Sequence, residues 1–129
     1  MKVHHIGYLV KNIEKTRVKF LGLGYEVERP VKFDAIRDVN IEFLINGGYR
    51  VELIQPLSET SPMYPLLKRY KNSPYHICYE VDDLNKAVEE LSGSGYTVIQ
   101  EPEVAPCIDD KKVAFLTNIS MGIIELVEI

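Results

Sequence analysis

A chain of 129 residues, 46% of them hydrophobic, has the size of one ordinary domain and can bury a core without disulfides or oligomerisation. The net charge is −4 at pH 7, and Lys and Arg are scattered rather than clustered, which argues against nucleic acid as a partner. The two cysteines, Cys78 and Cys107, have no CxxC or zinc-ligand spacing, so we expect reduced thiols and a cytoplasmic location.

The chain opens with the run HHIGYLV, in which β-branched and aromatic residues alternate with a period of two and predict a half-buried strand. The run meets charged residues too early for a signal peptide or a membrane-spanning helix, so no membrane partner is expected. Ile13, Val18 and Phe20 follow at helical spacing and predict a helix.

Three further strands complete the first part of the chain. A short strand is expected at residues 25–28, before a loop at Pro30. The runs NIEFLI and YRVELIQ flank Asn46-Gly47-Gly48, a strong turn signal between two hairpin strands. Residues 1–56 therefore predict a module of the order β-α-β-β-β.

A linker at residues 57–73 is richer in Ser, Pro and Lys and contains a predicted short helix at residues 64–70. Beyond it, YHICYEV predicts a strand, and Asp82 or Asp83 would cap a helix that ends at Gly93. Strands at residues 96–100, in KVAFLT and in GIIELVEI follow, so residues 74–129 again give β-α-β-β-β.

The two modules are an internal repeat, because residues 5–27 fall on residues 76–98 without a gap when the sequence is shifted by 71 positions. The shared His, glycines and Tyr are harder to attribute to chance than shared apolar positions. The identical pairs are His5/His76, Ile6/Ile77, Tyr8/Tyr79, Val10/Val81, Lys15/Lys86, Gly22/Gly93, Gly24/Gly95, Tyr25/Tyr96 and Val27/Val98.

Strand alternation places one His and one Glu of each module on the sheet face that the module's own helix leaves open. These residues are His5 and Glu52 in the first module, and His76 and Glu125 in the second. A buried carboxylate is costly unless it is paired or ligated, and two imidazoles with two carboxylates suit Zn, Ni, Co, Fe or Mn. Structural histidines, and glutamates that face solvent after a one-residue slip in register, are the alternatives.

The chain resembles the vicinal oxygen chelate superfamily, which includes glyoxalase I, methylmalonyl-CoA epimerase, extradiol dioxygenases and antibiotic-resistance proteins. The similarity to the epimerases is carried by HHIGYLVKNIEK, by VELIQPLSETSP with LLKRY after it, by YHICYEVDDLNKAVEEL and by IIELVE. It implies one α+β domain over residues 1–129, in which two βαβββ modules form a curved eight-stranded mixed sheet around a metal cavity.

The resemblance implies a divalent metal ion (Co, Ni, Zn or Mn) held by His5, Glu52, His76 and Glu125, and it selects His5 over its neighbour His4. It further implies proton abstraction next to a carbonyl chelated to the ion. On one face of NIEFLI the acid/base candidates are Asn40 and Glu42, and Glu42 is similar in place to a carboxylate of the epimerases. Glu125 is the second catalytic candidate, and solvent exposure is the alternative for Glu42.

The implied substrate is a small molecule, either a CoA thioester, as in the epimerases, or a glutathione hemithioacetal, as in glyoxalase I (lactoylglutathione lyase). A metal-free module that binds an antibiotic is the third reading, and an extradiol dioxygenase is disfavoured by the fourth ligand. The segment TNISMGIIE departs from the epimerase pattern, and a homodimer is expected from the family. Cations that would suit CoA phosphates, or are ordinary solvated charges, are Lys68, Arg69, Lys71, Lys111 and Lys112.

Overall fold

The computed structural model describes all residues from 1 to 129 and divides the chain into two compact units. The first unit is His5–Tyr75, and the second combines Met1–His4 with His76–Ile129. The amino-terminal strand thus contributes its first residues to the second unit and the remainder to the first. None of the helices is long and apolar enough to cross a membrane.

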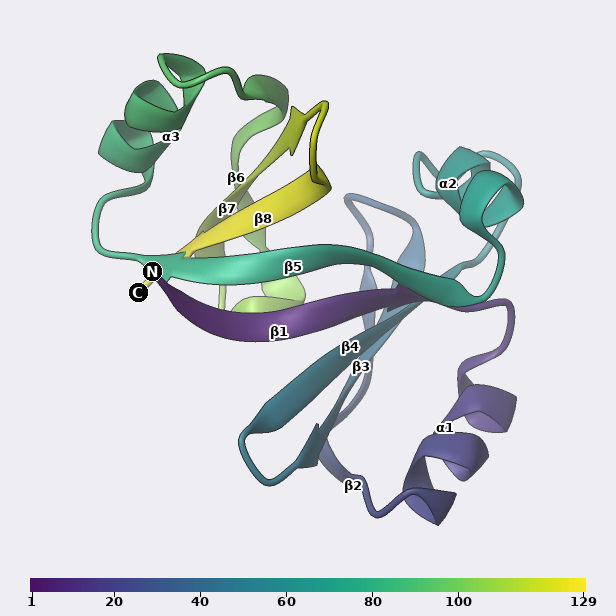
Figure 1. The fold of residues 1–129 in the computed structure, drawn as a ribbon. Helices are drawn as coiled ribbons and strands as arrows, with labels where there is room; N and C mark the ends of the chain where they lie inside the picture. Colours follow the sequence, from purple (N-terminus) through teal and green to yellow (C-terminus); the bar gives the residue numbers. More distant parts are fainter. The chain divides into compact units, whose positions relative to one another are not determined.

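The order β-α-β-β-β that the sequence predicts for both modules is confirmed, and so is the α+β class, with parallel and antiparallel strand pairs (Figure 1). The elements up to the linker are β1 (Lys2–Leu9), α1 (Ile13–Gly22), β2 (Glu26–Asp34), β3 (Val39–Asn46), β4 (Tyr49–Pro56) and α2 (Tyr64–Tyr70). The elements after it are β5 (Ser73–Val81), α3 (Leu84–Ser92), β6 (Thr97–Ala105), the 3-10 turn η1 (Pro106–Ile108), β7 (Lys111–Asn118) and β8 (Gly122–Glu128).

The strands of both units follow the same pairing scheme. In the first unit the order is β2-β3-β4-β1, with β1 parallel to β4 and the other pairs antiparallel. In the second unit the order is β5-β8-β7-β6, with β5 parallel to β8. A strand can pair in parallel with its partner only after a long connection, which here consists of a helix and two strands.

Equivalent local signals start and end the two main helices. The side chain of Asn12 caps α1 by accepting from the Lys15 amide at 2.9 Å, and Asp83 caps α3 by accepting from the Lys86 amide at 3.0 Å. Of the two predicted caps for α3, Asp83 is therefore the one used. The repeated glycines Gly24 and Gly95 follow the helices with φ of 97° and 91°, a conformation that other residues rarely adopt.

The repeat continues beyond the aligned segment, into the turns that join the second and third strands of each module. Asp38 in the first module has a φ of 50°, and Asp109, 71 positions later, has a φ of 54°. Both edge strands before these turns, β2 and β6, also have register irregularities at corresponding places. The equivalence of the two modules is thus a property of the backbone as well as of the sequence.

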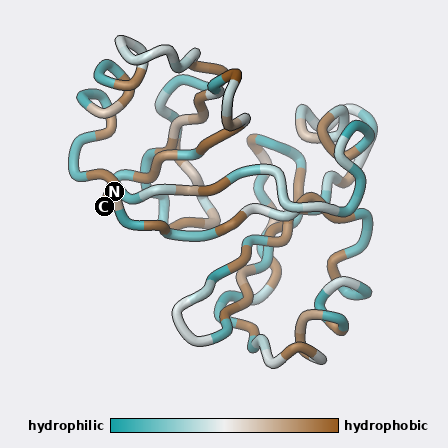
Figure 2. The backbone as a smooth tube through the Cα atoms, viewed as in Figure 1, coloured by the Kyte–Doolittle hydropathy of each residue, from teal (hydrophilic) through white to brown (hydrophobic).

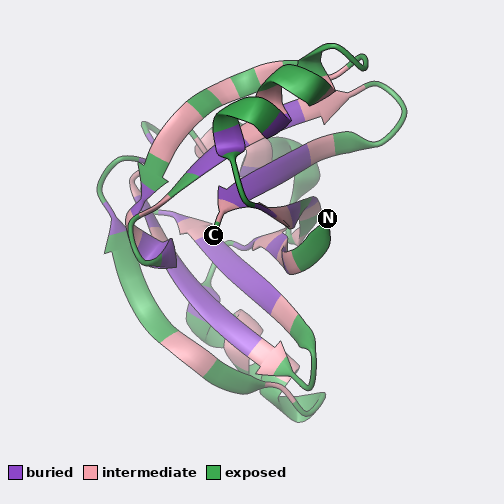
Figure 3. Ribbon diagram, turned by 90° about the vertical axis from the view of Figure 1, so that its left-hand side faces the viewer, coloured by how far each residue is buried: buried purple, intermediate pink, exposed green.

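Each unit has its own hydrophobic core on the sheet face covered by its helix. In the first unit the ring of Tyr8 on β1 packs edge-on against Phe20 of α1, with centroids 5.3 Å apart. Hydrophobic residues concentrate on the inner strands (Figure 2), and these strands are buried while the edge strands are largely exposed (Figure 3). The buried members of the two cores are Val10, Ile13, Leu44, Val51 and Leu53, and Val81, Leu84, Ala87, Ala114, Leu116, Ile124 and Leu126.

Replacing Leu53 with Ala tests the first of these cores. Because Leu53 is fully buried, the change should lower the free energy of unfolding by about 2–5 kcal/mol through lost burial and a new cavity. The matched control is Val18→Ala on α1, where the side chain is 64% exposed and the change should stay within about 0.5 kcal/mol. Urea denaturation of both variants measures the difference, and equal effects would contradict this core.

Candidate metal centre

A buried imidazole and a buried carboxylate meet in the first unit. His5 on β1 and Glu52 on β4 are 1% and 4% exposed, and His5 Nε2 lies 3.3 Å from Glu52 Oε1. The ring of Phe43 packs against His5 in an edge-on geometry with centroids 5.4 Å apart. This contact restricts the orientation of the imidazole and covers one of its sides with an apolar group.

The strand register explains why these side chains share a face. Glu52 is paired across the sheet with Phe43 of β3 and with Gly7 of β1, and residues paired directly across strands point to the same side. His5 lies two residues before Gly7 on the same strand and therefore points the same way. The predicted phase of Glu52 is thus correct, and the one-residue slip is excluded.

The second unit repeats this arrangement. His76 on β5 and Glu125 on β8 are both buried, and His76 Nε2 lies 3.0 Å from Glu125 Oε2. Phe115 of β7 is paired with Glu125 and packs edge-on against His76 with centroids 5.3 Å apart. Each unit therefore carries the same buried His–Glu pair beside a phenylalanine ring.

The donor atoms of each pair fit a divalent ion of borderline hardness, because an imidazole nitrogen and a carboxylate oxygen are ligands that Zn, Co, Ni and Mn accept. Burying a carboxylate is costly, and replacing such buried polar groups with apolar ones is often neutral or favourable for stability. A pair that both modules carry at corresponding positions therefore indicates a use other than packing.

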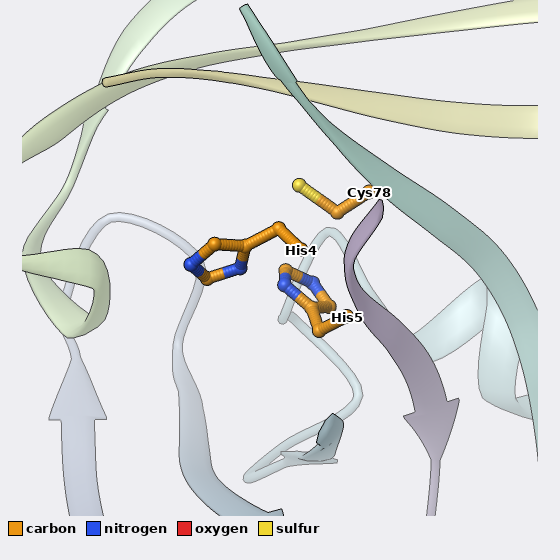
Figure 4. Close-up of side chains that lie close together, drawn as sticks. All are labelled: His4, His5 and Cys78. Carbon is orange, nitrogen blue, oxygen red and sulfur yellow. The ribbon is translucent and has the colours of Figure 1, made fainter. Parts of the chain in front are cut away.

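A third imidazole and a thiol lie close to each other in the second unit. Cys78, adjacent to Glu125 in the β5–β8 register, is buried, and its sulfur and a ring nitrogen of His4 lie within 4.8 Å of each other. Figure 4 shows the Cys78 side chain extending from β5 and the His4 ring beside it. His4, the neighbour of the predicted ligand His5, is half-buried in the structure.

Glu42, predicted to transfer a proton beside the metal, points away from the His5–Glu52 pair. In the register of β3 and β4 it is paired with Leu53, whereas its neighbour Phe43 is paired with Glu52. Glu42 therefore shares the helix-covered face with the core, where Arg17 Nε of α1 donates to both carboxylate oxygens at 2.8 and 3.0 Å. The structure therefore does not bring Glu42 beside the His5–Glu52 pair, and the solvent exposure that was its alternative is wrong, because Glu42 is buried.

The contact with Glu42 also affects Arg17. The hydrogen bond from the guanidinium to this carboxylate raises the pKa of Arg17 above its ordinary value, while burial acts in the opposite direction. Arg17 therefore remains charged, and the bond joins α1 to the sheet. Glu42 has a structural task that the sequence pattern did not reveal.

The cations that the sequence analysis considered for CoA phosphates are all at least partly exposed. Lys111 is half-buried and the others are exposed. The two phenylalanines beside the histidines were not predicted as site residues. Strand alternation puts Phe43 and Glu42 on opposite faces of β3. Only the pairing of β3 with β4 shows that Phe43 is the one that lies on the same face as Glu52.

Comparisons with known proteins agree with this picture. The chain matches the Glyoxalase/Bleomycin resistance protein/Dioxygenase superfamily over residues 4–115. It is 32% identical over 102 residues to the mitochondrial methylmalonyl-CoA epimerase of Bos taurus, covering 78% of this chain and 58% of that protein. It is 30% identical over 117 residues to the ethylmalonyl-CoA/methylmalonyl-CoA epimerase of Cereibacter sphaeroides, covering 89% of this chain and 87% of that protein.

Among solved structures, a variant of the Streptomyces coelicolor methylmalonyl-CoA epimerase in complex with 2-nitronate-propionyl-CoA superimposes with a TM-score of 0.84. The sequence identity is 22%, with coverage of 99% of this chain and 94% of that one, so this likeness shows the fold. The chain belongs to the glyoxalase/bleomycin resistance protein/dioxygenase superfamily. Both of these relatives bear the name of a methylmalonyl-CoA epimerase, and this chain spans little more than half the length of the bovine one.

Replacing Glu42 with Gln tests the structural task of this residue. The change weakens the contact with Arg17 on the buried face and should lower the free energy of unfolding by about 1–3 kcal/mol. In the control Glu28→Gln, the pair with Arg50 is about a quarter exposed, and the loss should stay below about 1 kcal/mol. Thermal and urea unfolding measure both, and a smaller loss for Glu42→Gln than for the control would refute the assignment.

Proposed function

We propose that this protein is a metal-dependent isomerase of the epimerase type, which moves a proton on the carbon next to the carbonyl of a CoA thioester such as methylmalonyl-CoA. The observation that carries this proposal is the buried His–Glu pair found in both units at corresponding positions. The named epimerase relatives supply the reaction class.

The proposed metal ligands are His5, Glu52, His76 and Glu125, which together would hold one divalent ion, namely Co, Ni, Zn or Mn. The repeat supports this set, because two equivalent pairs contribute two nitrogens and two oxygens. When bound, the ion would act as a Lewis acid for the negative charge that develops at the carbonyl oxygen. Held by these four side chains, the ion would still be able to accept substrate oxygens.

The protein's own groups would orient the substrate and move the proton. Glu125 is the proposed base, and its carboxylate would take the proton from the carbon next to the carbonyl. An epimerase needs a second acid/base group for the opposite side of this carbon. With Glu42 directed into the core, the remaining carboxylate at an equivalent position is Glu52, which we propose for that step.

The phenylalanines beside the histidines support this chemistry physically. Phe43 and Phe115 pack edge-on against the two imidazoles, which limits ring rotation and keeps water away from one side of each ring. Ordered ligands and restricted solvent access strengthen electrostatic stabilisation of a developing charge. The apolar lining also suits the methyl group of a methylmalonyl moiety.

Two other activities of the superfamily can be distinguished from epimerisation by their substrate and by their need for a metal. Glyoxalase I would consume the hemithioacetal of methylglyoxal and glutathione, and an antibiotic-binding module would need no metal. The epimerase relatives favour a CoA carrier over glutathione. The homodimer and the cytoplasmic location expected from the sequence stay predictions.

Solvent exchange tests the proposed reaction directly. Metal-reconstituted protein incubated with methylmalonyl-CoA in D2O should place deuterium on the carbon between the carboxylate and the thioester, and should interconvert the two epimers. Mass spectrometry measures the deuterium exchange. A coupled assay with a mutase that accepts only one epimer measures the interconversion of the two epimers. Turnover of the glutathione hemithioacetal without deuterium exchange into methylmalonyl-CoA would contradict the epimerase proposal.

Metal content tests the ligand set. After reconstitution with Co, Ni, Zn or Mn and dialysis, elemental analysis should give about one ion per chain, and Glu52→Ala should weaken metal binding at least tenfold. The control Glu42→Gln should bind the metal with unchanged affinity, because its side chain faces the helix. The ligand set is wrong if Glu52→Ala retains the affinity of the unaltered chain or if no metal binds.

A further inference from the structure

The end of α2 carries several cations, although the protein as a whole has a net charge of −4. Lys68, Arg69 and Lys71 are exposed, and α2 contains no acidic residue. Lys11, which follows β1, lies beside them, because its amide donates to Asn72 Oδ1 at 2.8 Å. We call these four cations, Lys11, Lys68, Arg69 and Lys71, the α2 patch, and all of them belong to the first unit.

The charges of the α2 patch are not neutralised within the protein. None of its four cations forms an ion pair with a carboxylate. Lys11 is far from the other three in the sequence, so only the fold brings the four together. Unpaired like charges add up to a potential that attracts anions. The α2 patch is therefore suited to an anion that carries more than one charge.

The other cations considered for CoA phosphates have acidic neighbours. Asp109 and Asp110 directly precede Lys111 and Lys112 in the sequence. On β6, Glu103 lies diagonally across from Lys111 on the same sheet face. These carboxylates offset the positive charge of the two lysines. The structure therefore favours the α2 patch over Lys111 and Lys112 as a phosphate site.

Lys71 has a backbone conformation that favours glycine. Its φ is 62° and its ψ is −158°, a combination that residues with a side chain rarely adopt. The amide of Lys71 caps α2 by donating to the carbonyl of Leu67 at 2.8 Å, and glycine would make the same bond without strain. Strained residues cluster at functional sites. A lysine at such a position therefore indicates a use for its side chain.

An aromatic ring lies among the cations. Tyr70 is 38% exposed, and the guanidinium carbon of Arg69 lies over its ring, 5.6 Å from the centroid. An exposed ring beside cations suits a nucleotide, because the base can stack on the ring while the phosphates contact the charges. The adenosine end of CoA has this combination of a purine ring and several phosphate groups.

The distance from the His5–Glu52 pair is compatible with a CoA carrier. His5 and Lys11 are six residues apart in the sequence, so their Cα atoms are separated by at most about 22 Å. In CoA a long, flexible arm links the thioester to the phosphates. One CoA thioester can therefore contact the first unit at both ends, with its acyl group near His5 and its nucleotide at the α2 patch.

We propose that the α2 patch and the ring of Tyr70 bind the phosphates and the adenine of the CoA carrier. This inference rests on the proposed function and deepens it, because it names the residues that would distinguish a CoA thioester from a glutathione hemithioacetal. Guanidinium and ammonium groups bind phosphate through charge-assisted hydrogen bonds. Glutathione has neither a phosphate nor a purine, so this surface would not contribute to its binding.

Binding of CoA and of pantetheine to the metal-reconstituted protein tests the proposal, because the two probes carry the same thiol and differ by the phosphorylated nucleotide. We expect the unaltered protein to bind CoA more tightly. Arg69→Gln should reduce this preference about fivefold to tenfold, as for the loss of a charge-assisted hydrogen bond. Isothermal titration calorimetry measures the dissociation constants of both probes.

The variant Lys71→Gly separates a binding role from a structural one. It should also reduce the preference for CoA, yet unfold at no lower urea concentration, because glycine relieves the backbone strain. The matched control is Lys112→Gln, which removes an exposed charge from the second unit and should leave the preference unchanged. An equal loss in Lys112→Gln, an unchanged preference in both Arg69→Gln and Lys71→Gly, or no preference in the unaltered protein would each overturn the proposal.

Vesicles of phosphatidylglycerol test whether a lipid surface occupies the α2 patch instead. The proposal expects no vesicle binding that depends on these cations. Vesicle binding that Arg69→Gln and Lys71→Gly both weaken, together with an unchanged preference for CoA, would assign the α2 patch to a lipid surface and overturn the proposal. Sedimentation of the protein with the vesicles measures this binding.

The epimerisation assay separates this proposal from the function on which it rests. Epimerisation by the unaltered protein, together with an unchanged kcat/KM and an unchanged preference for CoA in Arg69→Gln, refutes the nucleotide site and leaves the epimerase proposal standing. A preference for CoA that depends on Arg69 in a protein that does not epimerise methylmalonyl-CoA supports the nucleotide site and refutes the reaction.

Discussion

In each module the first strand pairs in parallel with the last strand, and the placement of the buried His–Glu pair depends on this pairing. In the first unit β1 lies beside β4, and in the second β5 lies beside β8. Residues far apart in the sequence therefore become neighbours, and an imidazole from one strand meets a carboxylate from the other. The helix between them in sequence covers the opposite face with the hydrophobic core, so the pair is buried without entering that core.

This division of each sheet into two faces separates two kinds of ion pair. On the helix-covered face, Arg17 and Glu42 join α1 to β3 by a two-oxygen hydrogen bond. On the other face, His5 and Glu52 form a pair that is costly to bury. Both glutamates are almost fully buried, so burial alone does not distinguish a structural carboxylate from a functional one. The strand register makes that distinction.

The two modules share their backbone features but differ in side chains. The backbone features that set the geometry are kept in both, including the positive φ of Gly24 and Gly95 and the irregular edge strands. The side chains beside the two His–Glu pairs differ in charge, since Arg29 corresponds to Gln100.

The sequence by itself determined the two modules, the order of their elements and the four residues proposed as ligands, because a repeat and a period of two are local properties that a single chain displays. It also chose His5 and Glu52 by strand phase. Only the tertiary structure decided the face on which Glu42 lies, since alternation puts Glu42 and Phe43 on opposite faces of their strand without showing which of them is paired with Glu52. The pairing of β3 with β4 and the position of Arg17 on α1 settle that choice, and both arise from contacts between segments distant in the sequence.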